Sequence, residues 1–309
     1  MFAPLVLFVY NRLEHTKKTI LALSQNTIAK KTCLYIYSDA AKNPDSEAKV
    51  NRVREYIHSR EIEESFMSVT IIEAQQNKGL ANSIIEGVSS IISKYKRVIV
   101  IEDDNISSKD FLQFMNDCLN KYETNTKIWS IGGFSCVDKF PADYVDDVYI
   151  VGRTCSYAWA TWENRWNKVD WSVQNYRTSF RFNLPKRILF NKFGNDRSNM
   201  LDLQMHSRVN SWAIRFCYAE FEYRMYTVYP KVSRISNIGH DGSGTHFNRK
   251  TSEDDERFNI PLSSINNSYV LPNTIEINDD VCRNFAQHFN EPVWKCFRRY
   301  IGSFFKYGI

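Results

Sequence analysis

The chain has 309 residues, of which 43% are hydrophobic and 14% aromatic, enough for a sizeable core. Its 40 basic and 35 acidic residues leave a formal net charge of +5, which is too diffuse to indicate nucleic-acid binding. No apolar run approaches the roughly 18 residues that a membrane-spanning helix needs, and the apolar N-terminus lacks a basic leader and a cleavage site. The sequence therefore predicts one large or two small α/β domains, soluble or peripheral to a membrane.

The seven cysteines are odd in number and widely spaced. They form no CxxC pair and no Cys/His metal spacing, which argues against a structural zinc site. A reduced cytoplasm is the simplest compartment for such a chain, and we expect a cytoplasmic protein, with the inner face of the membrane as the other location.

Strand and helix patterns alternate over the first 125 residues. Four strands are predicted over 5–10, 32–38, 69–73 and 98–101. The segments between them and after the last one have apolar residues at helical spacing and are predicted to be helices. Such a β-α repeat predicts an α/β fold with a mostly parallel central sheet and helices on both faces.

The fourth strand ends at three consecutive carboxylates, Glu102, Asp103 and Asp104. Its four β-branched residues are typical of a strand buried on both faces, and open α/β sheets bind ligands at the carboxyl ends of such strands. Adjacent carboxylates repel one another, so a fold usually supplies a cation or hydrogen-bond donors. A hard ion such as Mg²⁺ or Mn²⁺ is one interpretation, and a solvated acidic turn that caps the next helix is the other.

Three further polar residues follow strand or turn positions at the same expected edge: Arg12, Asp39 and Lys78. A basic pair beside a metal-binding acid cluster suits a nucleotide diphosphate. Singly, each residue has a plainer interpretation, as a strand cap, the start of a turn or a solvated loop lysine. The chain has no GxGxxG after the first strand and no GxxxxGK[ST], which argues against dinucleotide dehydrogenases and P-loop enzymes.

The second half of the chain is rich in aromatic residues. Trp159, Trp162 and Trp166 recur at spacings of three and four, which predicts one helical face packed in the core. A sugar-stacking platform for an acceptor is the alternative for one of them. Further strands are predicted over 129–133, 148–153 and 226–230, and a helix begins near residue 210.

Residues 237–247 combine three glycines with two histidines. Glycine-rich backbone can approach phosphate closely, and such a loop can close over a ligand. Either His240 or His246 is a candidate to reach a pyrophosphate or a metal, and an ordinary surface loop is the alternative.

Residues 292–309 mix basic and aromatic side chains in the pattern of a basic amphipathic helix. Peripheral contact with an anionic membrane and packing onto the domain both explain this pattern. We expect a catalytic domain over 1–250, with a nucleotide-binding half (1–125) and an acceptor half (126–250), followed by an extension over 251–309.

These motifs resemble the GT-A glycosyltransferases, most closely the branch of N-acetylglucosaminyltransferase I and its bacterial family-2-like relatives, from Pro4 to about Phe247. Residues 98–111 resemble that branch's Glu-Asp-Asp variant of the DxD motif. The resemblance implies that Asp104 binds Mn²⁺ or Mg²⁺, while Glu102 and Asp103 contact the ribose, uridine or sugar of the donor.

The resemblance extends to other segments. Asn11-Arg12 is similar to a nucleotide-contacting Asp-Arg pair, and Asp39 resembles the acid that reads the base. Residues 157–162 resemble the acceptor floor, and residues 238–246 resemble the loop that orders over the nucleotide sugar. The resemblance and the residue types together give ligand-binding roles to Arg12, Asp39, Lys78 and His246.

Two positions depart from the family pattern. Ala158 stands where the acceptor floor has glycine. Asn210 stands where the family has its general-base aspartate, and an amide cannot take a proton from an acceptor hydroxyl. Asp202 is the expected substitute, with Asp196 and Asp170 as alternatives.

The predicted function is metal-dependent transfer of a hexosyl or N-acetylhexosaminyl group, with inversion, from a nucleotide diphospho-sugar to a glycan or lipid-linked acceptor. A UDP-sugar is the expected donor, and no nucleic-acid partner is expected. A nucleotidyltransferase on a similar sheet is one alternative, although Asn11-Arg12 lacks the glycines of its loop. A non-catalytic sugar-nucleotide or glycan-binding module is the other, and Asn210 favours it.

Overall fold

The computed structural model describes residues 2–242, 262, 268–274, 276–292, 294 and 298. The main sheet consists of β1 (Leu5–Val9), β2 (Cys33–Ser38), β3 (Ser68–Glu73), β4 (Arg97–Glu102), β6 (Ile128–Gly132), β7 (Val148–Val151), β8 (Ala158–Trp162) and β9 (Tyr226–Pro230). A second, two-stranded sheet consists of β5 (Asn105–Ser107) and β10 (Ile235–Asn237).

The α-helices are α1 (Leu13–Ser24), α2 (Pro44–Ile57), α3 (Arg60–Ser65), α4 (Leu80–Tyr95), α5 (Phe111–Tyr122), α6 (Glu163–Trp166), α7 (Leu184–Phe190), α8 (Arg197–Met205), α9 (Trp212–Glu222) and α11 (Asp279–Gln287). Three short helical turns accompany them: η1 (Ala29–Lys31), η2 (Tyr176–Phe180) and η3 (Asn191–Phe193).

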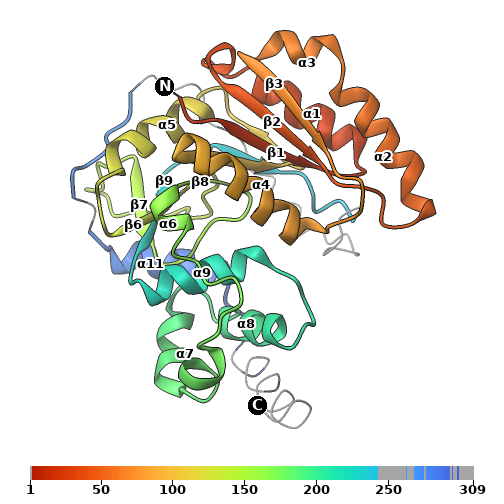
Figure 1. Cartoon of the computed structure of the whole chain (residues 1–309). Helices are drawn as coiled ribbons and strands as arrows, with labels where there is room; N and C mark the ends of the chain where they lie inside the picture. Colours follow the sequence, from red (N-terminus) through yellow and green to blue (C-terminus); the bar gives the residue numbers. More distant parts are fainter. Residues whose placement is uncertain are drawn as a thin grey trace.

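The main sheet has the strand order β3-β2-β1-β4-β8-β6-β9-β7 (Figure 1). The first four strands in this order are mutually parallel, and β6 and β9 are parallel to each other. β8 is antiparallel to both β4 and β6, and β7 is antiparallel to β9. Only β7 and β8 therefore run against the other strands of this sheet. The predicted α/β class with a mostly parallel central sheet is confirmed, and it agrees with the GT-A-type fold that we expected.

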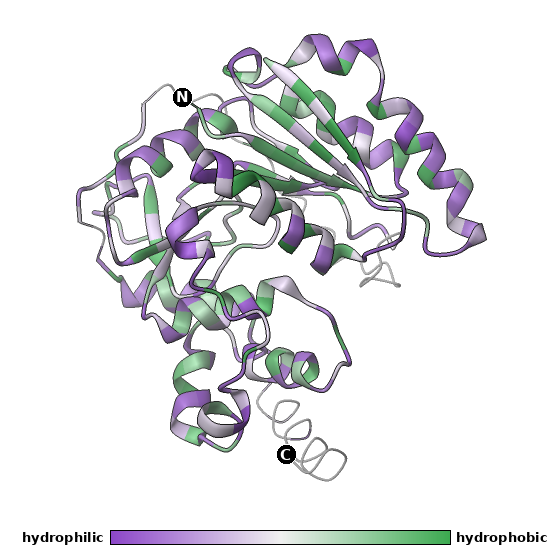
Figure 2. Ribbon diagram, viewed as in Figure 1, coloured by the Kyte–Doolittle hydropathy of each residue, from purple (hydrophilic) through white to green (hydrophobic). Residues whose placement is uncertain are grey.

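Helices cover both faces of the sheet because its strands are apolar on both sides. Alternate residues of β1 enter different cores, as the period of a strand requires. Leu5 and Leu7 pack in a core with residues of α1, α2, α3 and α5. Val6 and Phe8 pack in a core with residues of α4, α6 and α9. Figure 2 shows the hydrophobic residues concentrated along these strands.

The tryptophan-rich segment forms a strand and a short helix, not the single helical face that its spacing predicts. Trp159 lies on one face of β8 and Trp162 lies on the other. Trp166, in α6, returns to the face of Trp159 and stacks on it at 5.7 Å between ring centroids. All three side chains are at most 2% exposed. They are core residues, and the sugar-platform alternative is wrong because no ring is accessible.

A helical lobe lies beyond α9, on the side away from the sheet (Figure 1). It contains η2, α7, η3 and α8, and it has a small aromatic core of its own around Phe180, Phe190 and Tyr218. Helix α9 joins this lobe to the sheet, since Phe216 packs on Trp129 and Trp159.

Helix α11 packs on the far edge of the sheet, where the ring of Phe285 meets the rings of Tyr149 and Tyr229. The predicted basic helix over 292–309 falls almost entirely outside the described residues. No helix in the described ranges is both long and apolar enough to cross a bilayer.

A buried glutamate joins α9 to the sheet. Glu220 is 0% exposed and accepts hydrogen bonds from the hydroxyls of Thr227, at 2.7 Å, and Thr154, at 3.2 Å. Burial raises the pKa of Glu220 from its ordinary value of 4.5 to about 8, against the opposing charge of Arg197 and the two hydroxyl donors. The folded protein therefore binds a proton here that the unfolded chain releases.

This proton predicts a pH-dependent stability. Between pH 4.5 and 8 the native state holds more protons than the unfolded state, so the free energy of unfolding falls as pH rises through this window. At about 1.4 kcal/mol per pKa unit, the free energy of unfolding of the wild type should fall by roughly 3 kcal/mol between pH 5.5 and 8.5 because of this group. Glu220→Gln should not show this fall. Urea unfolding of both proteins at the two pH values measures this, and parallel losses in the two proteins would contradict it.

Candidate functional site

The expected site residues follow neighbouring strand ends. In the sheet Val9 pairs with Ser38, and Phe8 pairs with Glu102. Because these strands are parallel, the segments that begin at Arg12, Asp39 and Glu102 leave the sheet at the same edge. The prediction that the fold brings them to one edge is confirmed.

Arg12 binds the acid turn directly. Its Nη2 lies 2.5 Å from Asp103 Oδ1 and 2.8 Å from Asp104 Oδ2. The Arg12 side chain is 18% exposed, and those of the two aspartates are 6% and 16% exposed. With Glu102, three carboxylates face one guanidinium, which leaves a formal charge of −2 when all are ionised. The protein's own cation therefore only partly offsets the repulsion.

The pKa values of this turn show the same imbalance. Burial raises the pKa of Glu102 well above its usual range, and the charges of Asp104 and Asp103 add to this. Burial also raises the pKa of Asp103, although Arg12 opposes the shift. Burial alone would lower the pKa of Arg12, but the two aspartates outweigh it and raise that pKa. A further cation would relieve the carboxylates.

The Asp104 carboxylate is held in one orientation. Its Oδ1 accepts hydrogen bonds from the side-chain amides of Asn105, at 3.0 Å, and Asn237, at 3.1 Å. Asn237 lies at the end of β10, which pairs with β5 immediately after the acid turn. A Cβ at Gly239 would lie 2.2 Å from Asp104 Oδ2, so only glycine allows this approach. Asp104 Oδ2 accepts a hydrogen bond from Arg12, at 2.8 Å.

The donor set fits a hard divalent ion. Asp103 Oδ2 is buried without a hydrogen-bond partner, and an orphaned buried carboxylate oxygen is costly unless a ligand satisfies it. No group of three or more His, Cys, Asp or Glu side chains converges as a complete metal site within the described residues. This is compatible with a Mg²⁺ or Mn²⁺ that takes one or two carboxylates and completes its shell with phosphate oxygens.

Sequence reasoning missed part of this site on α1. His15 Nε2 lies 3.3 Å from Asp241 Oδ2 and 3.3 Å from the carbonyl oxygen of Ile238. Thr19 donates a hydrogen bond to the carbonyl oxygen of Asp103, at 2.8 Å. Arg12, His15 and Thr19 recur at spacings of three and four, so a polar stripe on this helix was the signal that could have found them.

Asp39 fastens the loop between β3 and α4. Its Oδ1 accepts from the backbone amides of Ala40 and Lys78, each at 2.9 Å. Its Oδ2 accepts from the Gly79 amide, at 2.8 Å, and from the Asn77 side chain, at 3.1 Å. Both oxygens are therefore occupied within the protein, and contact with a nucleotide base would have to compete with these four donors.

Replacing Asp39 should loosen this loop. Asp39→Asn puts an amide group against two of the donors, which costs about 1–3 kcal/mol for each buried group left unsatisfied. We expect a lower free energy of unfolding and faster amide hydrogen exchange at Lys78 and Gly79. The matched control is Asp45→Asn at an exposed position. Unchanged exchange at both amides would show that Asp39 does not hold the loop.

Three other candidate ligands are less informative. The Lys78 side chain is 45% exposed and its Nζ lies 2.5 Å from Glu86, whose hydrogen bond raises the pKa of the lysine. Its described contact is therefore with a neighbouring helix residue and not with the acid turn. His240 is buried, with its ring edge-on to Tyr157. His246 lies outside the described residues.

The expected general base does not fit its position. Asp202 is 5% exposed, and its two oxygens accept from Arg187 at 2.8 and 2.6 Å and from the Tyr176 hydroxyl at 2.9 Å. Asp202 is therefore a buried, paired carboxylate of the helical lobe with no access to an acceptor. This corrects the expectation for Asp202.

The alternatives to Asp202 are also engaged. Asp196 makes a two-bond pair with Arg153, at 2.7 and 2.9 Å. Asp170 accepts from the hydroxyl of Ser172 and from the backbone of its own turn, and these bonds outweigh the opposing effect of burial and lower its pKa. The Asn210 side chain accepts from Arg215 at 2.9 Å.

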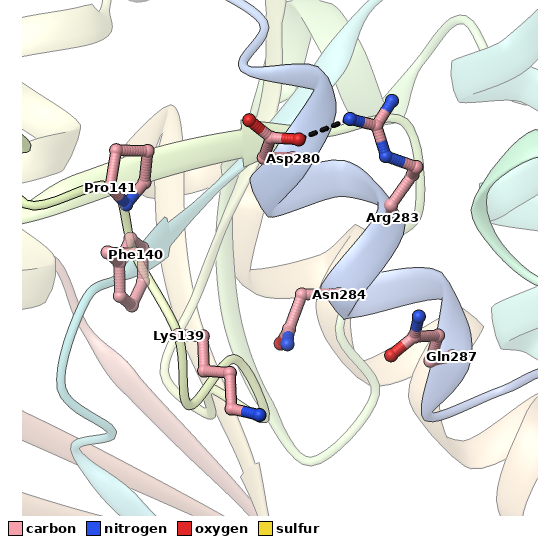
Figure 3. Close-up of a pocket in the computed structure, with 7 residues that line it drawn as sticks. All are labelled: Lys139, Phe140, Pro141, Asp280, Arg283, Asn284 and Gln287. Carbon is pink, nitrogen blue, oxygen red and sulfur yellow. Dashed lines mark hydrogen bonds and ion pairs between the residues drawn. The ribbon is translucent and has the colours of Figure 1, made fainter.

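One open groove, of about 480 Å³, lies away from these residues (Figure 3). It runs between residues 139–141 and α11, on which Arg283 pairs with Asp280 one turn away. None of the predicted site residues lines it, so it is not part of the candidate site.

Neither a scan of protein families nor a search of curated proteins finds a match to this sequence. Among solved structures, the crystal structure of S. aureus TarS 1-349 is similar at a TM-score of 0.40 and 9% identity, over 74% of this chain and 60% of that chain. The same TarS fragment in complex with UDP gives a TM-score of 0.41 and 8% identity, over 76% of this chain and 60% of that chain. At this distance the likeness carries no argument about function, which rests on the site itself.

Proposed function

We propose that this chain is a GT-A-type glycosyltransferase that uses a nucleotide diphospho-sugar and a divalent ion. The acid turn carries the proposal, because Glu102, Asp103 and Asp104 form a partly neutralised anionic cluster at the carboxyl end of a buried parallel strand. A hard cation offsets this charge and brings the phosphates of a donor with it. The resemblance of the segment to the DxD motif supports the same conclusion.

The chain's own residues have separable roles in this proposal. Asp104, with Asp103 Oδ2 beside it, would hold Mn²⁺ or Mg²⁺, which when bound stabilises the leaving diphosphate as a Lewis acid. Arg12 holds both aspartates and adds positive charge next to the phosphates. Asn105 and Asn237 fix Oδ1 and so set the direction in which Oδ2 faces.

Inversion, the donor sugar and the acceptor are parts of the proposal that rest on the resemblance alone. A UDP-sugar is the first donor to test, with a hexosyl or N-acetylhexosaminyl group. A glycan or lipid-linked acceptor suits surface-polysaccharide biosynthesis. A cytoplasmic location is part of the same proposal, and the free thiols of the six described cysteines are compatible with it.

A non-catalytic binding module is the second candidate. It is favoured by the engagement of the three aspartates that the sequence offered as bases, Asp202, Asp196 and Asp170. It is also favoured by the amide of Asn210 at the position where the family has its base. It predicts tight binding of the nucleotide sugar without transfer or hydrolysis, whereas the enzyme releases a nucleoside diphosphate when acceptor is present.

The experiment is a thermal-shift screen of nucleoside diphosphates and diphospho-sugars, each with Mn²⁺ and with EDTA. A ligand that binds the native state raises the melting temperature by mass action. We expect a metal-dependent rise for one nucleotide. If no nucleotide gives a shift in Mn²⁺, the acid turn is not a donor site and the proposal fails. Release of nucleoside diphosphate then separates enzyme from binding module.

A further inference from the structure

Helix α7 presents an apolar face to solvent. At about 100° per residue, Leu184, Pro185, Ile188 and Leu189 occupy one continuous arc of roughly 140°. Leu184, Ile188 and Leu189 are 57%, 63% and 63% exposed, whereas Phe190 on the opposite side is 0% exposed. A surface helix normally turns a polar side to solvent. Helix α7 differs, because it has apolar residues on both its outer and its inner side.

Phe182 extends this surface beyond the start of the helix. Its ring is 64% exposed, and the guanidinium carbon of Arg181 lies 4.8 Å from the ring centroid. We call Phe182, Leu184, Pro185, Ile188 and Leu189 together the α7 face. Figure 2 shows hydrophobic residues on α7 at the outer end of the molecule, far from the first strands of the sheet (Figure 1).

The segment that carries the α7 face is basic. Residues 171–195 contain no Asp or Glu and five basic residues: Arg177, Arg181, Lys186, Arg187 and Lys192. Arg177 and Lys192 are exposed. Lys192 lies 3.5 Å from Asp279, but both side chains are more than half exposed and such a pair is weak.

The acids that neutralise this segment act on its inner side. Lys186 pairs with Glu222 at 2.7 Å, and Arg187 pairs with Asp202 at 2.6 Å. These four side chains are at most 25% exposed, so their charges cancel behind the α7 face. Arg177 and Lys192 stay as exposed cations in the same segment as the α7 face.

We propose that the α7 face docks on an anionic lipid bilayer. Exposed aliphatic side chains enter the boundary between headgroups and acyl chains, and flanking cations bind the anionic headgroups. Ile188 and Leu189 make the apolar contact, and Arg177 and Lys192 make the ionic one. This surface differs from the basic C-terminal segment that the sequence predicts, and docking through it does not depend on the proposed transferase activity.

The test is co-sedimentation of the full chain with vesicles of phosphatidylcholine alone or mixed with phosphatidylglycerol. We expect binding to the anionic vesicles that weakens as salt is raised. The double variant Ile188→Ser/Leu189→Ser should bind at least about tenfold more weakly, because it removes two of the exposed aliphatic side chains of the α7 face. The matched control is Met67→Ser, which changes a residue that is 65% exposed, directly before β3 and outside the helical lobe.

Each other outcome overturns the proposal. If the full chain does not bind anionic vesicles, the proposal is wrong. Equal binding by the wild type and the double variant places the membrane contact elsewhere. A wild-type dimer in light scattering that the double variant converts to monomer, without vesicle binding, shows that a second copy covers the α7 face. The metal-dependent nucleotide shift should be the same in the double variant, which keeps this test separate from the proposed function.

Discussion

Asp104→Ala should abolish metal-dependent sugar transfer and the Mn²⁺-dependent part of the nucleotide thermal shift. The variant removes the carboxylate that Arg12, Asn105 and Asn237 hold in place. Loss of the ion's charge at the leaving diphosphate amounts to several kcal/mol, so turnover should fall by at least about a hundredfold. Product release and melting temperature are measured with Mn²⁺ and with EDTA.

Asp143→Ala is the matched control, because Asp143 is exposed in a turn outside the acid cluster. It should keep both the thermal shift and the turnover of the wild type. Loss of one of three mutually repelling carboxylates should leave Asp104→Ala folded without ligand. Wild-type turnover in a folded Asp104→Ala protein would contradict the site assignment.

Trp159→Ala should lower the free energy of unfolding by about 3–5 kcal/mol, the range for removing a large aromatic side chain from a core. Trp159 is 1% exposed and stacks on Trp212 at 4.8 Å and on Trp166 at 5.7 Å between ring centroids. Because α6, β8 and α9 meet at this ring, the cavity has little freedom to collapse. Urea unfolding measures the loss.

Trp294→Ala is the control for the tryptophan change, since Trp294 is 62% exposed. Its effect should stay within about 0.5 kcal/mol. Below its own melting temperature, Trp159→Ala should still show the metal-dependent nucleotide shift, because the ring lies in the core and not in the donor site. An unchanged free energy of unfolding in Trp159→Ala would contradict the assignment of this ring to the core.

The four parallel strands of the first half and their main helices could be predicted because each has a local signal, whereas α3 and β5 were not predicted. Val98–Ile101 reads as a buried strand and is one, and the residues after it form the acid turn. The segment 158–166 misled because tryptophans at spacings of three and four fit a helix. The segment is instead a strand followed by one helical turn, and its tryptophans divide between the two cores of the sheet. The strand forms by pairing with β4 and β6, which are distant in the sequence, so the local spacing does not show it.

The site was predictable only where one segment carried it. The acid turn is contiguous, and Arg12 follows a strand end, so both were found. The partners of Asp104 come from residue 237, and Asp39 is bound by residues 77–79, at sequence separations of 133 and about 40. The burial of Asp202 depends on Arg187 and Tyr176, which no motif connects to it.

The pairing of β5 with β10 fixes chain length around Asp104. Its register sets Asn237 opposite Asn105 and Ile235 opposite Ser107. One inserted or deleted residue in this stretch would turn every following side chain to the other side of the ladder and move Gly239 away from Asp104. Homologous chains that share this arrangement should therefore vary in length at exposed turns such as the one around Asp143, and keep the 235–239 spacing constant.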